Sequence, residues 1–208
     1  MTQPSLGIAV TGHRDLRPKD LPALRHEVAS IITTLQQHNP SQPLQLLSGL
    51  AEGADQLVAE VALQQGISVA AILPMPLGIY RDQMPHDVQI KLDELCARSD
   101  VTITLPLGNL PLAQLRSSEE ARATTYEALA HYLVSHSQVL IALWDGLPSD
   151  KPGGTCRVVN YARFGFALGH SEPVQSTCST VYHVLTPRLS NSDVIGAVNT
   201  IKLDCPHP

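Results

Sequence analysis

The sequence predicts a Rossmann-like α/β protein whose doubly wound, mostly parallel sheet carries helices on both faces. Short apolar runs that end at a glycine alternate along the chain with segments whose apolar residues recur at helical spacing. Strands that alternate with helices of this length are typical of parallel sheets covered on both sides. The 208 residues are enough for one well-cored domain, so we expect a single domain over residues 1–208.

The first strand–helix unit has the clearest pattern. LGIAVTG (6–12) is a short apolar run that ends in glycine, and apolar residues at helical spacing follow from Leu21 to Leu35. The same unit recurs as PLQLLSG (43–49) and a helix over about 51–66 that ends at a glycine. Two consecutive units of this kind favour a parallel arrangement of their strands.

The remainder of the chain continues this alternation. Further strands are expected at 67–74, 100–107, 137–146 and 180–187, with helices at 86–99, 119–136 and 155–168. The Pro-rich stretches 74–85 and 104–111 are expected to be loops at the rim of the sheet, and residues 106–118 are expected to form a loop rich in Pro, Leu and Gly. NTIKLD (199–204) is a candidate edge strand.

Composition and charge argue against several classes of protein. The net charge of −5 provides no general attraction to nucleic acid or to acidic lipid, so a nucleic-acid partner is not expected. The four cysteines are widely separated and lack metal-ligand spacing, and no apolar run approaches the roughly 20 residues that span a bilayer. We therefore expect a cytoplasmic protein with reduced thiols and without a membrane segment, metal or cofactor.

Polar and glycine residues gather where the predicted strands end. Ligands of open parallel sheets bind outside the carboxyl ends of the strands, where loops and helix N-termini meet. The candidate binding residues are Gly12, His13 and Arg14 after the first strand, Ser48, Gly49, Glu52 and Asp55 after the second, and Asp145, Gly153, Gly154 and Thr155 after the fifth.

Each candidate has both a functional and a structural interpretation. The turn Gly153-Gly154-Thr155 is suited to phosphate because glycines leave backbone N–H groups uncovered at a helix N-terminus, but it also suits an ordinary capped helix. Glu52 and Asp55 either bond ribose hydroxyls or only favour the helix dipole.

Two further candidates follow the first and fifth strands. His13 and Arg14 form a charged pair for phosphate, unless they are ordinary surface residues. Asp145 is a candidate for binding a ribose, a base edge or a metal, unless it serves the Asp-Gly turn. Trp144 is expected to pack in the protein rather than to stack on a base.

Three stretches together, in this order, resemble the SLOG superfamily, the Rossmann-like domains related to Lonely-guy phosphoribohydrolases and to the DNA-processing protein A group. They are VTGHRDL, LLSGLAEGADQLVAEVALQQGISVAAILPMPLGIYRDQ and VLIALWDGLPSDKPGGTCRVVNYA, and the likeness extends to about residue 169. The resemblance implies a nucleotide-derived small molecule as ligand, held by the candidate residues above. It also implies a homo-oligomer and, if the protein is a sensor in a bacterial defence or stress system, a separate effector protein.

The resemblance also bears on catalysis. The phosphoribohydrolases have the motif PGGxGTxxE. This chain has the shorter Pro152-Gly153-Gly154-Thr155, and Val158, three residues after the threonine, is in the place of the glutamate. A valine neither activates water nor stabilises a cationic sugar. We therefore expect binding or sensing of a nucleotide-derived signal. The alternative is an N-glycosidase or related hydrolase of nucleoside phosphates, with Glu52 or Asp55 as the catalytic candidates.

Overall fold

In the computed structural model, which describes residues 4–165, 175–191 and 198–206, seven strands form one sheet. The strands are β1 (Leu6–Gly12), β2 (Leu44–Ser48), β3 (Ser68–Leu73), β4 (Val101–Thr104), β5 (Val139–Trp144), β6 (Thr180–Leu185) and β7 (Thr200–Asp204). Their order is β4-β3-β2-β1-β5-β6-β7, and all neighbours are parallel except β6 and β7. The predicted doubly wound, mostly parallel sheet and its candidate edge strand are thus confirmed.

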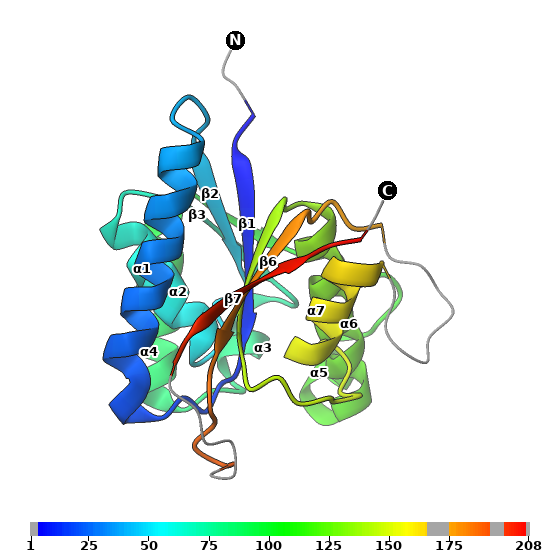
Figure 1. Cartoon of the computed structure of the whole chain (residues 1–208). Helices are drawn as coiled ribbons and strands as arrows, with labels where there is room; N and C mark the ends of the chain where they lie inside the picture. The colour runs from blue at the N-terminus through cyan, green and yellow to red at the C-terminus, as the bar shows by residue number, and fades with distance from the viewer. Residues whose placement is uncertain (1–3, 166–174, 192–197, 207–208) are drawn as a thin grey trace.

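Helices cover both faces of this sheet (Figure 1). The helices α1 (Leu21–His38), α2 (Ala54–Gln64) and α4 (His86–Arg98) lie on one side, and α6 (Glu119–Ser135) and α7 (Thr155–Phe164) lie on the other. Successive residues of β1 belong to the two cores: Ile8 and Val10 pack with the first group of helices, and Ala9 packs with the second. Double burial explains why the central strands are continuous apolar runs.

The strand order places a reversal point between β1 and β5. From β1 the chain adds β2, β3 and β4 on one side, and it then returns to add β5 on the other side of β1. The loops after β1 and β5 therefore diverge toward opposite faces of the sheet. Such a point is the usual ligand position of open α/β sheets.

The predicted loops 74–85 and 106–118 each contain a short helix, so the prediction of loop throughout these stretches was wrong. The helix α3 (Leu77–Arg81) begins after Pro76, whose carbonyl accepts the N–H groups of Ile79 and Tyr80 at 2.9 and 3.0 Å. The helix α5 (Leu112–Ser117) begins after Pro111 and buries Leu115. A proline can precede a helix because the first helical N–H groups need no internal partner.

The ends of other elements differ from the prediction by a few residues. The strand β4 is shorter than the predicted 100–107, and a 3₁₀ helix (Pro18–Asp20) precedes α1. The helix α7 ends at Phe164, since Gly165 adopts a left-handed conformation with φ of +70°. Residues 166–168 of the predicted helix lie outside the described residues. Within the described ranges, none of the helices is both long and apolar enough to cross a bilayer.

Candidate functional site

A cleft of about 850 Å³ opens at the carboxyl ends of β1 and β5, where the strand order reverses. The predicted residues that line it are Gly12, His13, Arg14, Asp55, Asp145, Gly153, Gly154 and Thr155. Among the described residues, the lining does not include Ser48, Gly49 or Glu52. The structure thus brings most of the candidates together from three separate segments, and it leaves much of the loop after β2 outside.

The loop after β1 is fixed between β5 and α2. The N–H of His13 donates to the carbonyl of Leu143 at 3.0 Å, and the carbonyl of His13 accepts the N–H of Ala54 at 3.0 Å. A Cβ on Gly12 would lie 2.4 Å from the Cβ of Ala54. Gly12 is therefore required for close packing of this loop, whether or not it contacts a ligand.

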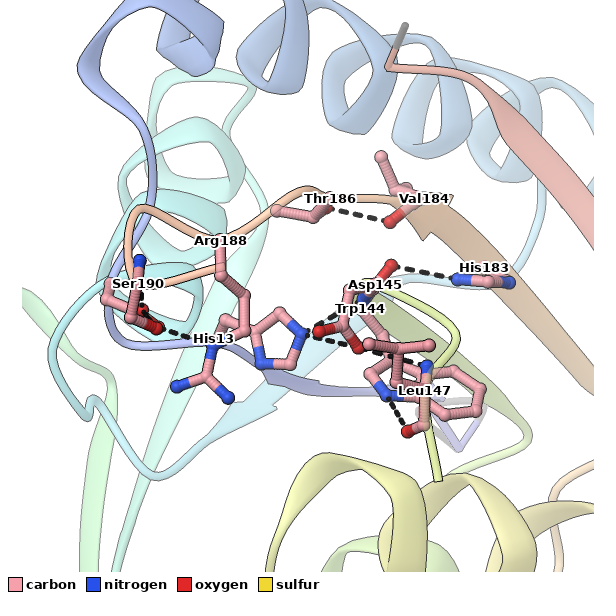
Figure 2. A network of polar contacts seen from close by, with 10 residues as sticks. His13, Trp144, Asp145, Leu147, His183, Val184, Thr186, Arg188 and Ser190 are labelled. Carbon is pink, nitrogen blue, oxygen red and sulfur yellow. Dashed lines mark hydrogen bonds and ion pairs between the residues drawn. The ribbon is translucent and has the colours of Figure 1, made fainter. Parts of the chain in front are cut away.

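His13 and Asp145 join the loops after β1 and β5 (Figure 2). The N–H of Asp145 donates to Nε2 of His13 at 2.9 Å, and Oδ1 of Asp145 lies 3.1 Å from the same nitrogen. Burial lowers the pKa of His13 despite the attraction of Asp145, which favours a neutral ring whose Nε2 accepts a hydrogen bond. Oδ1 of Asp145 also accepts the N–H of Leu147 at 3.0 Å, as expected for turn chemistry.

The loop after β6 forms a further wall of the site. Nε of Arg188 donates to Asp15 at 2.9 Å, and the N–H of Ser190 donates to the other Asp15 oxygen at 3.1 Å. Burial would raise the pKa of Asp15, but the hydrogen bonds from Ser190 and Arg188 outweigh it and lower the pKa. Arg188 thereby lines the cleft, far in sequence from the predicted residues.

The turn before α7 has a different set of contacts from the one the sequence suggests. The N–H of Gly153 donates to Oε2 of Glu127 at 2.6 Å, and the N–H of Gly154 donates to the carbonyl of Lys151 at 2.9 Å. Gly153 has φ of +63°, and an added Cβ would lie 2.6 Å from the backbone of Tyr126. Both N–H groups assigned to phosphate therefore have partners within the protein, and the glycines shape the turn.

Glu127 on α6 fixes this turn to α7. Its carboxylate accepts a hydrogen bond from the hydroxyl of Tyr161 and lies 3.6 Å from Nη1 of Arg157 and 3.7 Å from Nε2 of His131. Burial would raise its pKa, but the hydrogen bonds from His131, Tyr161 and Gly153 and the charge of Arg157 outweigh burial and lower the pKa to about 2. Glu127 is thus a charged structural link behind the wall of the cleft.

The loop after β2 has an internal role. The hydroxyl of Ser48 accepts the N–H of Leu50 at 3.0 Å, and Leu50 has the positive φ of +52° that non-glycine residues rarely adopt. A Cβ on Gly53 would lie 2.3 Å from the carbonyl oxygen of Arg14. Ser48 and Gly53 therefore shape the loop against the segment after β1. The function of Ser48 as a ligand contact remains an expectation from the sequence.

Of the two catalytic candidates from the sequence, Asp55 lines the described cleft and Glu52 does not. The exposed fraction of Asp55 is 8%, and its Oδ2 accepts the N–H of Ala51 at 3.3 Å. Burial raises the pKa of Asp55 to about 7, against the opposing effects of this hydrogen bond and of the charge of Arg14. Because its pKa is about 7, Asp55 can exchange a proton near neutral pH. The guanidinium carbon of Arg14 also lies 5.6 Å from the ring centroid of Tyr126.

The cleft is lined by both cationic and acidic side chains. This favours a ligand whose anionic part lies beside the cations and whose neutral part lies beside the acids. The cationic side chains are Arg14, Arg122, Lys151 and Arg188, and the acidic side chains are Asp55, Glu119 and Asp145. The first turn of α7 adds the positive end of a helix beside Thr155. In the described part of the chain, no group of three or more His, Cys, Asp or Glu side chains is placed to hold a metal ion.

The sequence reasoning missed several lining residues, namely Tyr80, Gln83, Arg122, Tyr126, Lys151 and Arg188. Arg122, Tyr126 and Leu133 recur at helical spacing on α6, so the periodicity of that helix was an available signal for one wall. Tyr80 lies on α3 within a stretch that the sequence predicted as loop, and Arg188 follows β6. Neither position has a local pattern that indicates a site.

A mostly parallel sheet with helices on both faces and a cleft at the point of strand reversal defines a Rossmann-like α/β protein. No model of a protein family and no curated protein matches this sequence. Solved structures do match, at low identity, and the likeness concerns the fold alone. Proteins of the DNA-processing protein A group, which the sequence resembles, are among the matching structures.

Three of the matching structures illustrate the distance. DNA processing protein A from Streptococcus pneumoniae is 18% identical over 66% of this chain and 41% of that one, with a TM-score of 0.44. DNA processing protein A from Helicobacter pylori, described with a single-stranded DNA binding mode, is 14% identical over 70% and 57%, with a TM-score of 0.40. The structural genomics target TM1055 is 14% identical over 66% and 60%, with a TM-score of 0.37. The matched part is less than two thirds of each of these proteins.

Proposed function

We propose that this protein binds a nucleotide-derived small molecule in the cleft at the ends of β1 and β5. The observation that carries the proposal is the convergence of Arg14, Lys151 and Arg188, from three separate loops, on one cleft at the point of strand reversal. A volume of about 850 Å³ is within the range of small-molecule sites. Cations placed in this way suit a phosphate ester, and the net charge of −5 does not favour a polyanion.

Another part of the lining is suited to an uncharged moiety. Leu147 and Pro148 line the cleft, and Leu147 is 43% exposed. The indole N–H of Trp144 donates to the carbonyl of Leu147 at 3.1 Å, and the indole packs at 5.2 Å from the ring of His183. Trp144 supports the loop through these contacts, and it also lines the cleft. The apolar surface of Leu147 and Pro148 suits the flat face of a base.

Hydrolysis of an N-glycosidic bond is the second candidate, because Asp55 lies in the cleft with a pKa of about 7. A general acid or base works best with a pKa near the working pH. Two observations argue against hydrolysis. Val158 lines the cleft at the position where the phosphoribohydrolases that the sequence resembles have glutamate, and Glu52 is outside the lining of the described cleft. Binding without turnover is the better-supported function.

Native mass spectrometry of the purified protein tests the proposal. We expect a bound species with the mass of a nucleotide, or, after extensive dialysis, binding of a nucleoside monophosphate by calorimetry. Incubation of the same nucleotides with the protein, followed by chromatography, should detect no free base. Base release that is abolished by Asp55→Ala would establish the hydrolase instead, and absence of any nucleotide binding would refute both functions.

The homo-oligomer and the separate effector protein also remain proposals, supported by the sequence resemblance alone. Sedimentation at micromolar concentration measures the first directly. A monomer under these conditions would remove the oligomer from the proposed function without affecting the cleft.

A further inference from the structure

The hydroxyl of Tyr80 is a buried polar group without a partner. Tyr80 lies on α3 with an exposed fraction of 0%, and no hydrogen bond reaches its hydroxyl from the residues that the structure describes. The same side chain lines the cleft. A buried hydroxyl without a partner destabilises the folded state, and polar groups of this kind are rare. Its position in the wall of the cleft indicates that the partner comes from a ligand.

The polar groups near Tyr80 already have hydrogen-bond partners other than the Tyr80 hydroxyl. The ring of Tyr126 lies 6.3 Å from the ring of Tyr80, and the Tyr126 hydroxyl donates to Oε1 of Gln83 at 2.9 Å. The amide nitrogen of Gln83 donates to the carbonyl of Ile79 at 3.0 Å and lies 3.0 Å from the sulfur of Met75. The Gln83 side chain thus has three partners, namely Tyr126, Ile79 and Met75. The hydroxyl of Tyr126 has a hydrogen-bond partner, and the hydroxyl of Tyr80 has none among the described residues.

Asp55 supplies a second polar group to the same region. Asp55 is 8% exposed and lines the cleft, as Tyr80 does, and, after burial, the charge of Asp55 is one cause of the raised pKa of Tyr80. Oδ2 of Asp55 accepts the N–H of Ala51 at 3.3 Å, which is long for a hydrogen bond to a carboxylate. A carboxylate accepts up to about four hydrogen bonds, so capacity for a ligand donor remains.

The surrounding charges select the kind of group that fits. A phosphate beside Asp55 would be repelled by the carboxylate, and an ammonium group would be repelled by Arg14, whose charge acts on both Asp55 and Tyr80. A neutral group that both donates and accepts hydrogen bonds suits Asp55 in either protonation state and also accepts from the phenol of Tyr80. Hydroxyl groups have both capacities.

The geometry points to a sugar subsite in which the Tyr80 hydroxyl and the Asp55 carboxyl bind the vicinal hydroxyls of a ribose phosphate. This inference rests on the proposed function and specifies which part of the ligand lies at α3. The phosphate binds to the cationic side chains of the cleft. The subsite makes Tyr80 a specificity-determining residue that distinguishes ribose from deoxyribose.

Ribose 5-phosphate, 2-deoxyribose 5-phosphate and inorganic phosphate are the probes, because they carry no base and so require no assumption about it. We expect Tyr80→Phe to weaken binding of ribose 5-phosphate by about three- to tenfold, the usual effect of one lost hydrogen bond. The wild type should bind 2-deoxyribose 5-phosphate more weakly by a similar factor. Binding of inorganic phosphate should be unchanged in Tyr80→Phe.

Thermal melts separate this effect from a change in stability. Tyr80→Phe removes a hydroxyl without a partner, so it should melt at or above the temperature of the wild type. Tyr126→Phe is the matched control, because it removes a hydroxyl that is bonded to Gln83 and should melt at a lower temperature. Asp55→Asn keeps an acceptor for the Ala51 N–H and should weaken ribose 5-phosphate as Tyr80→Phe does.

The outcomes distinguish the subsite from the proposed function. If the wild type binds ribose 5-phosphate and Tyr80→Phe binds it equally well, or loses inorganic phosphate to the same extent, the sugar subsite is overturned while the nucleotide cleft stands. If the wild type binds neither ribose 5-phosphate nor a nucleoside monophosphate, both are overturned.

Discussion

Replacement of Glu127 by glutamine should destabilise the protein, although this residue lies behind the cleft rather than in it. The carboxylate accepts the Gly153 N–H at 2.6 Å and the Tyr161 hydroxyl, and it pairs with Arg157 at 3.6 Å. A fall of its pKa from 4.5 to about 2 favours the charged form by about 3 kcal/mol. Since the side chain is 20% exposed, solvent screening reduces this contribution to about 2 kcal/mol.

For a protein of this size, a loss of about 2 kcal/mol corresponds to a fall of roughly 4–8 °C in Tm. Differential scanning calorimetry at pH 7 measures it, with Glu94→Gln on the exposed side of α4 as the control that should change Tm little. The depressed pKa makes the contribution complete above pH 4.5 and progressively lost as the pH falls toward 2. The gap between wild type and variant should therefore narrow in acid. A variant that melts within 1 °C of the wild type at pH 7 would refute the reasoning.

Three further changes test the cleft. The pKa of Asp55 is raised to about 7, so the folded state binds this proton more tightly and wild-type stability should fall as the pH rises from about 4 to 7, by up to about 4 kcal/mol. Urea unfolding should give a flatter pH dependence for Asp55→Asn, and identical profiles would contradict the raised pKa. Arg14→Ala should weaken a phosphate ester about tenfold in calorimetry with the fold intact, and unchanged affinity would remove Arg14 from the site. Gly153→Ala should cost more stability than Gly66→Ala, because both have positive φ but only Gly153 has backbone 2.6 Å from the added Cβ. Equal losses would show that the contact with Tyr126 relaxes.

The sequence by itself determined the fold class and the general place of the site. The strands β1, β2, β3 and β5 are buried on both faces, so their residues are continuous apolar runs that local pattern detects. The glycines and polar residues at the ends of these strands then identify the edge where the cleft lies, since the carboxyl ends of parallel strands share one edge. The spacing of apolar residues and the residues that follow each strand are local features, so a single sequence is enough to detect them.

Only the tertiary structure decided which polar groups face the cleft and which serve the protein. Ser48 and the N–H groups of Gly153 and Gly154 have internal partners, and the partner of Gly153 is Glu127, which is 26 positions away in the sequence. Tyr80 and Arg188 reach the cleft from α3 and from the loop after β6. For Gly153, Tyr80 and Arg188 the outcome depends on distances between segments that are remote in sequence, and no local pattern contains those distances. Ser48 and Gly154 have partners two and three positions away, and there the folded conformation of the loop decides.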